Sequence, residues 1–294
     1  MSPIKLGLLG AIVAAGLALA FVWVVAARRV ERQRRGAGTY PGFAIGLVTN
    51  FLDTLGIGSF APTTAALKVF RLAPDELIPG TLNVGLAIGS ILESLIFITT
   101  VAVAPRLLVS MVLAAAVGAW FGAGIVVRLP RRAIQVGMGV ALLIAGSVFA
   151  AVNLGLLPGG GVALDLVGWK FPVAVGASLV LGALMTIGIG MYAPTMILLA
   201  LMGVHPLAAF PVMMGACALL MPVAGVRFVR SGWLAWGPAL GLSLGAVIGV
   251  PFAAFVVKSL ELQKLRWLVV AVVLYAAGAM LWSARAAVSR PPSA

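Results

Sequence analysis

Apolar runs long enough to cross a lipid bilayer follow one another along most of this chain. A helix that crosses the hydrocarbon core needs about 20 residues, and residues 4–27 alone meet this length. Because the chain is 63% hydrophobic and 9% charged, it has too few polar side chains to cover a water-facing surface. The sequence predicts an all-α polytopic membrane protein, and further apolar segments lie at 41–70, 77–103, 107–127, 133–153, 171–202, 207–226, 233–257 and 265–284.

The net charge of +13 comes from Lys and Arg in the short gaps between apolar runs. No basic domain is present, so we expect the lipid bilayer and not nucleic acid as a partner. The first basic cluster follows the first run and contains Arg28, Arg29, Arg32, Arg34 and Arg35. Basic clusters of this kind mark cytoplasmic loops. We therefore expect a permanent N-terminal transmembrane helix in the cell (plasma) membrane, with the N-terminus outside and the C-terminus in the cytoplasm.

Two apolar segments are interrupted by copies of one decapeptide. The sequence TLGIGSFAPT at 54–63 returns 132 positions later as TIGIGMYAPT at 186–195, with seven of ten positions identical. The same offset relates Pro74 to Pro206 and Pro79 to Pro211. We therefore expect two repeats. The predicted division is an N-terminal helix and basic linker at 1–40, a first repeat at 41–153, a Gly-rich connection at 154–170, a second repeat at 171–285 and a tail at 286–294.

The basic residues also bear on whether the two motif segments cross the membrane. If every segment crosses, 11 of the 20 basic residues face the cytoplasm, whereas 14 of 20 do so if both motif segments re-enter on one side. The positive-inside rule favours the re-entrant arrangement. It gives seven spanning helices and two re-entrant hairpins, with three crossings per repeat, so that the repeats are inverted. Nine spanning helices are the alternative.

Each motif should break its helix at Gly-x-Gly and start a second half-helix. Glycine permits the backbone angles of such a turn, and the following proline fits the first turn of the next helix. Unpaired N–H groups at a helix N-terminus favour anions, although the breaks could also serve only to kink the helices. The candidate binding residues are Thr54, Gly56, Gly58, Ser59, Phe60, Pro62, Thr63, Thr186, Gly188, Gly190, Tyr192, Pro194 and Thr195.

A few further polar side chains fall inside apolar segments. Ionisable groups at membrane depth are functional candidates, so Asp53 and Glu93 are candidate carriers of a coupling proton. Each could instead be a neutral carboxyl bonded within the bundle. Asn50 and Asn83 either line a cavity or bond across helices. One His and one Cys cannot build a metal site, so we predict no cofactor, and we assign Cys217 to packing.

Glycines also recur at helical spacing away from the breaks. Gly118-x-x-x-Gly122 and the series Gly241, Gly245 and Gly249 are typical of faces where two membrane helices pack closely. We expect these glycines to contribute to packing and not to chemistry.

The motifs GIGSFAPT and GIGMYAPT, together with the basic turn RLPRRAIQVGMGVALLIAG, resemble the sulfite exporter TauE/SafE family of membrane permeases. The resemblance covers residues 41–285. It implies export of sulfite or organosulfonates, or more broadly anion permeation. The positions that match are Gly56, Gly58, Pro62, Gly188, Gly190 and Pro194. In place of a further glycine common in that family, this chain has Ser59-Phe60 and Met191-Tyr192, which reshape the expected site.

These features together predict a secondary transporter for a small anion, such as a sulfur oxyanion or organosulfonate, with possible coupling to protons. A passive anion channel is one alternative and a membrane-embedded enzyme another. We do not expect an enzyme, because the chain has no clustered His, Asp and Glu and no nucleotide-binding lysine motif. Assembly into a homo-oligomer stays open.

Overall fold

A computed structural model describes residues 2–30, 36–156 and 161–256, together with positions 274, 277, 278 and 281. These residues form helices and no strand. Five helices are long and apolar enough to cross a bilayer, which confirms an α-helical membrane protein. They are α1 (Pro3–Ala27), α7 (Pro105–Val126), α11 (Pro206–Ser231), α12 (Trp236–Val256) and a composite of η1 (Asp75–Leu77), α5 (Ile78–Gly85) and α6 (Ala87–Thr100).

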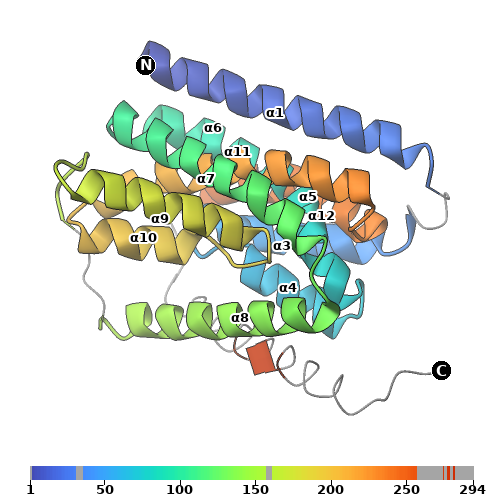
Figure 1. Cartoon of the computed structure of the whole chain (residues 1–294). Coiled ribbons are helices and arrows are strands. Elements are labelled where there is room, and N and C mark those ends of the chain that lie inside the picture. Colours follow the sequence, from blue (N-terminus) through green and yellow to red (C-terminus); the bar gives the residue numbers. More distant parts are fainter. Residues whose placement is uncertain are drawn as a thin grey trace.

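The outer surface of the bundle is apolar. Helix α1 lies along the outside of the other helices (Figure 1) and buries little of its surface. Leu17 and Phe21 on α1 and Phe121 on α7 are each at least 65% exposed. Side chains of this kind are stable on the surface of a monomer when the surroundings are lipid. Helix α8 (Arg131–Asn153) lies beside the bundle (Figure 1). Most of the predicted segment 265–284, and the whole of the tail 286–294, lie outside the described residues.

Each motif segment is a pair of short helices, as the Gly-x-Gly breaks predict. The first pair is α3 (Thr39–Thr54) and α4 (Phe60–Val69), and the second is α9 (Lys170–Met185) and α10 (Tyr192–Leu201). Helices α4 and α10 both have 10 residues, and their bounds differ by the offset of the sequence repeat. The same offset relates α3 to α9, the composite helix to α11, and α7 to α12 to within two residues. The duplication is therefore visible in the order and length of the helices.

Both pairs return to the end of the bundle from which they start. Lys170, at the start of α9, donates from Nζ to the carbonyl oxygen of Met202, just after α10, at 2.9 Å. The two helices lie side by side in Figure 1. Ala37, before α3, and Leu72, after α4, line one cleft. Helices α3 and α4 thus form one hairpin, and α9 and α10 form another.

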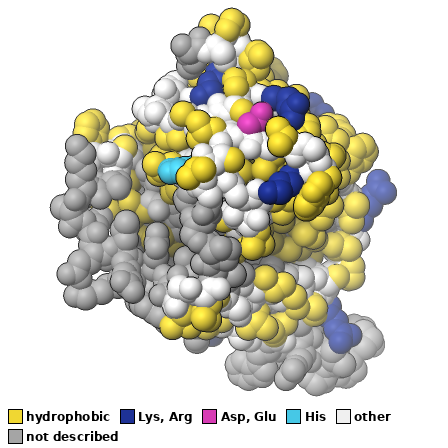
Figure 2. All heavy atoms as spheres, turned by 90° about the vertical axis from the view of Figure 1, so that its left-hand side faces the viewer, with side chains coloured by type: hydrophobic (Ala, Val, Ile, Leu, Met, Phe, Trp, Pro, Cys, Tyr) yellow, Lys and Arg dark blue, Asp and Glu magenta, His cyan; other side chains and the backbone are white. Residues whose placement is uncertain are grey.

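The two hairpins start from opposite ends of α11. The cleft beside Ala37 also contains Gly232, which follows the last residue of α11. At the other end, His205, which precedes α11, donates from its N–H to the carbonyl oxygen of Ala163, near the start of α9. Figure 2 looks onto this second end, where a few Lys and Arg side chains and the histidine lie among hydrophobic side chains.

The repeats exchange partners in the bundle. Helix α3 packs along α12, and its counterpart α9 packs along α7, the counterpart of α12. Both contacts depend on glycine, because a Cβ on Gly118 would overlap the carbonyl oxygen of Leu179, and one on Gly241 would overlap that of Thr39. The predicted role of these glycines in close packing is confirmed, and the same holds for Gly122, Gly245 and Gly249.

Candidate functional site

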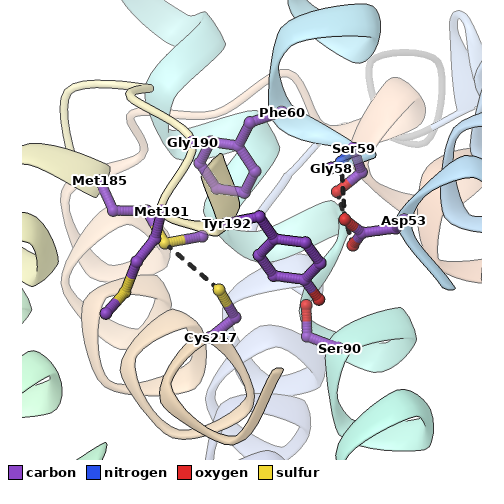
Figure 3. A pocket seen from close by; sticks show the side chains of 10 residues that line it. All are labelled: Asp53, Gly58, Ser59, Phe60, Ser90, Met185, Gly190, Met191, Tyr192 and Cys217. Atoms are coloured by element: carbon purple, nitrogen blue, oxygen red, sulfur yellow. Dashed lines mark hydrogen bonds between the residues drawn. The ribbon is translucent and has the colours of Figure 1, made fainter. Parts of the chain in front are cut away.

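The two helix breaks meet at one buried cavity (Figure 3). Its volume is about 20 Å³, which is room for one water molecule. Among the residues that the structure describes, no Lys or Arg lines it. The lining residues are Asp53, Gly58, Ser59, Phe60, Ser90, Met185, Gly190, Met191, Tyr192 and Cys217. Each break thus contributes its last glycine and the next two residues.

The breaks face each other through matching contacts. A Cβ on Gly58 would lie 3.8 Å from the Cβ of Tyr192, and a Cβ on Gly190 would lie 3.5 Å from the Cβ of Phe60. Gly58 and Gly190 are equivalent in the repeat, and so are Phe60 and Tyr192. Each glycine therefore makes room for the aromatic residue at the start of the opposite half-helix.

The backbone at the breaks explains the glycines and prolines of the motif. Gly56, Gly58 and Gly188 have φ of +80°, +93° and +104°, a region that side chains with a Cβ rarely adopt. Pro62 and Pro194 are the third residues of α4 and α10. At that position an N–H has no acceptor within the helix, so proline costs no hydrogen bond. The predicted placement of both prolines in a first turn is confirmed.

Asp53 caps the half-helix at the first break. Its Oδ1 accepts from the backbone N–H of Ser59 at 2.7 Å, and its Oδ2 accepts from the Ser59 hydroxyl at 2.8 Å. The Asp53 side chain is buried. Two donors, one to each oxygen, at a helix N-terminus are the partners that suit an ionised carboxylate. The sequence suggested either a proton carrier or a neutral carboxyl, and the geometry favours a third role, as the cap of α4.

The second break has no equivalent cap. The offset places Met185 opposite Asp53 and Met191 opposite Ser59, and a thioether is only a weak acceptor. Met185 Sδ lies 3.7 Å from Cys217 Sγ. Within the described part of the chain, no side chain accepts from the N–H groups of Gly190, Met191 or Tyr192 as Asp53 does from Ser59. The start of α10 therefore brings unpaired backbone donors to the cavity wall.

Glu93 lies behind the cavity wall and links three helices. It is fully buried on α6. Its Oε2 accepts from the Tyr192 hydroxyl of α10 at 2.7 Å. The hydroxyl oxygen of Thr54 on α3 lies 2.9 Å from Glu93 Oε1 and also 2.9 Å from the carbonyl oxygen of Asn50. Glu93 thus connects the start of α10 in the second hairpin to the end of α3 in the first hairpin.

The structure brings some of the predicted site residues to the cavity and leaves others away from it. Asp53, Gly58, Ser59, Phe60, Gly190 and Tyr192 line it. Thr54, Gly56, Pro62, Thr63, Thr186, Gly188, Pro194, Thr195 and Glu93 do not. Glycines and prolines in this second group shape the breaks, and the buried hydroxyls of Thr63 and Thr195 have no hydrogen-bond partner in the described structure. Their part in binding an anion stays a prediction.

Neither predicted asparagine lines the cavity. Asn50 donates from its amide to the carbonyl oxygen of Gly46 at 2.6 Å, and Asn83 donates to that of Pro79 at 2.9 Å. Each acceptor is one turn earlier on the same helix, so the amide N–H₂ finds a partner locally. The side-chain oxygen of Asn50 packs against Gly89 on α6. The side-chain oxygens of Asn50 and Asn83 are buried without a hydrogen-bond partner in the described structure, and a role for these residues along a substrate path stays a prediction.

Four lining residues were not predicted, namely Ser90, Met185, Met191 and Cys217. Met185 and Met191 could have been found by the offset, because they align with Asp53 and Ser59. Ser90 and Cys217 lie on α6 and α11, outside the motif, and no sequence signal places them at the breaks. Cys217 had been assigned to packing alone.

Neither a family model, nor a curated protein, nor a solved structure matches the chain. The resemblance to sulfite exporters therefore rests on the duplicated motif and the basic turn and stays a prediction. In the part of the chain that the structure describes, no group of three or more His, Cys, Asp or Glu side chains could hold a metal ion. The function is therefore argued from the cavity itself.

Proposed function

We propose that this protein is a secondary transporter that moves a small anion across the plasma membrane. The observation that carries the proposal is the uncapped N-terminus of α10 at a buried cavity between two helical hairpins. Gly190, Met191 and Tyr192 line that cavity, and their N–H groups carry the partial positive charge of a helix start. A negatively charged solute is the partner that such donors favour at membrane depth.

The arrangement of the repeats supports alternating access. The hairpins start from opposite ends of α11, and α3 and α9 exchange partners between the repeats. Both features are expected when the second repeat is inverted relative to the first, with the site at the interface of the repeats. Seven spanning helices with two re-entrant hairpins account for these contacts better than nine spanning helices do.

The distribution of charge supports the proposed orientation. Two clefts lie at the end of the bundle from which α3 starts, and Arg29 and Arg230 line them. Leu72, which also lines one of these clefts, places its neighbour Arg71 at the same end. The opposite end has Lys5, which bonds to Val101, and Lys170. Arg106 also lies at the opposite end, where it bonds to the carbonyl oxygen of Leu166, so the orientation rests on the basic cluster that follows α1, which the positive-inside rule places in the cytoplasm. The N-terminus then lies outside.

The size of the cavity favours a transporter over a channel. A volume of about 20 Å³ accommodates one water molecule and not sulfite with its sulfur and three oxygens. The substrate would enter only when α4 and α10 separate, so this conformation is closed. A movement of the two half-helices that admits the substrate suits a carrier, which exposes its site to one side of the membrane at a time.

The lining chemistry suits a sulfur oxyanion or an organosulfonate. Backbone N–H groups at the start of α10 can donate to the oxygens, whereas the hydroxyls of Ser59 and Ser90 already donate to Asp53 and to Met221 Sδ. Met185, Met191 and Cys217 form a soft, polarisable wall for the sulfur atom or an apolar substituent. The substrate class follows the resemblance described above and is part of the proposal.

Transport by the purified protein in liposomes tests this function. We expect saturable uptake of ³⁵S-sulfite and exchange against unlabelled sulfite inside the vesicle. Non-saturating conductance without exchange would identify a channel instead. A thermal-shift screen with sulfite, sulfate, sulfoacetate and taurine compares substrates, because a ligand that binds only the folded protein raises its melting temperature. No shift with any of the four would contradict a site for sulfur oxyanions.

A further inference from the structure

We propose that Glu93 carries the proton that is transported with the anion, and that the closed cavity requires this proton. The inference rests on the proposed function and deepens it, because it assigns the coupling role to one residue. Glu93 is not a wall residue of the cavity. It is the acceptor for Tyr192, the first residue of α10, whose N-terminus is the proposed anion site.

The contacts of Thr54 leave room for a proton on Glu93. The Thr54 hydroxyl has one hydrogen, yet its oxygen lies 2.9 Å from two acceptors, the carbonyl oxygen of Asn50 and Oε1 of Glu93. A carbonyl oxygen can only accept. If Thr54 donates to Asn50, the contact with Glu93 is a hydrogen bond only when Glu93 donates. A protonated Oε1 satisfies all of these groups, while Oε2 accepts from Tyr192. An ionised Glu93 that accepts from Thr54 and Tyr192 satisfies them as well, so the assignment of the proton rests on the second carboxyl beside Glu93.

The titratable neighbours of Glu93 favour a proton on its carboxyl group. Asp53 from α3, Tyr192 from α10 and Cys217 from α11 interact with it. Among the described residues, no Lys or Arg forms an ion pair with the carboxyl group of Asp53 or of Glu93. The ion pair that is seen joins Lys68 to Asp75, away from the cavity. Asp53 accepts from two donors and suits the ionised form. A second negative charge beside it, away from water, would be strongly unfavourable.

The coupling of anion transport to proton transport follows from the two neighbouring carboxyl groups of Asp53 and Glu93. An anion at the start of α10 adds negative charge next to Asp53, so the cavity can close around it only with Glu93 neutral. Water on one side supplies the proton to the Glu93 carboxylate, and the same proton returns to water on the other side after the cavity opens. Loss of the proton places two negative groups together and separates α10 from α6. Anion and proton therefore cross in the same direction, one proton in each cycle.

Glu93→Gln tests the coupling and keeps the hydrogen bonds that residue 93 makes with Tyr192 and Thr54. A glutamine oxygen can accept from Tyr192, and its N–H₂ can donate to Thr54, so the closed state stays available. In liposomes we expect the variant to retain exchange of ³⁵S-sulfite at equal pH and to lose uptake driven by a pH gradient. Thr99→Val is the matched control, because this exposed hydroxyl on the same helix bonds only to α6 carbonyls. Gradient-driven uptake by Glu93→Gln at the wild-type level would overturn the inference.

An infrared measurement tests the proton independently of any substrate. At neutral pH we expect the wild-type protein to show the carbonyl stretch of a buried carboxylic acid, which disappears in Glu93→Gln and persists in Asp53→Asn. A band that is unchanged in Glu93→Gln would also overturn the inference. If the wild-type protein exchanges none of the sulfur anions, the proposed function fails, whereas the infrared band still decides whether Glu93 holds a proton.

Discussion

The two helix breaks share a backbone plan and differ in the groups that complete it. At the first break the buried carboxylate of Asp53 accepts both from the N–H and from the hydroxyl of Ser59. At the second break Met185 and Met191 occupy the equivalent positions, and the donors at the start of α10 are left without a side-chain acceptor. The difference teaches that one half-helix end has a side-chain cap and its equivalent has none, which is why we propose the second end, and not the first, as the anion site.

The outer ends of the hairpins differ in the same sense. After α4, Lys68 pairs with Asp75, and Asp75 also accepts from Gln135 of α8 at 2.7 Å. The equivalents of Lys68 and Asp75 in the second repeat are Ala200 and Leu207. Among the described residues, the second hairpin has no such carboxylate pair at this position. Lys170 bonds there to the carbonyl oxygen of Met202, and Arg106 lies over the ring of Phe171. A hairpin held by fewer charged contacts costs less to displace, so we expect α9 and α10 to move more than α3 and α4 during transport.

The largest effect is expected when the second break receives the cap of the first. In Met185→Asp/Met191→Ser, the new carboxylate can accept from residue 191 as Asp53 does from Ser59. It occupies the donors of α10 and adds a second negative charge to the cavity that Asp53 already lines. We expect sulfite exchange and the thermal shift with sulfite to be abolished in protein that is still folded and monodisperse. Met191→Ser alone is the control, because it adds no charge. Wild-type exchange by the double variant would show that the start of α10 is not the anion site.

A smaller effect is expected from removal of the existing cap. Asp53→Ala leaves the buried Ser59 N–H and hydroxyl without partners and should destabilise the protein by about 2–4 kcal/mol, given the cost of a lost hydrogen bond to a charged group. Met185→Leu, at the equivalent position, keeps volume and apolar character and should cost less than about 1.5 kcal/mol. Thermal unfolding in detergent compares the two. Equal losses of stability would remove the distinction between a structural break and a ligand-binding one.

Much of this architecture could be predicted because it depends on local chemistry. The apolar runs predicted the long helices. The Gly-x-Gly sequence at Gly56 and Gly58, and its repetition, predicted the two helix breaks. The contacts of Asp53 and Glu93 could not be predicted, since they depend on how helices that are distant in sequence are brought together. Tyr192, at the start of α10, bonds to Glu93, which is 99 residues earlier in the chain. Cys217 shows the same limit, because its place at the cavity follows from the packing of α11 and not from any motif.

The smallest effect separates the glycines of the two breaks. Gly58 has φ of +93°, so Gly58→Ala should cost about 1–2 kcal/mol from backbone strain alone. Gly190 does not have a positive φ. A Cβ at this position would make an ordinary contact, 3.5 Å from the Cβ of Phe60. We therefore expect Gly190→Ala to fold with nearly wild-type stability while it reduces the room at the start of α10. Gly176→Ala, which meets nothing within 4 Å, is the control in thermal unfolding. If Gly190→Ala were the more destabilised variant, the second break would be the more tightly fitted one, and the ligand-binding end would have to be assigned to the first break.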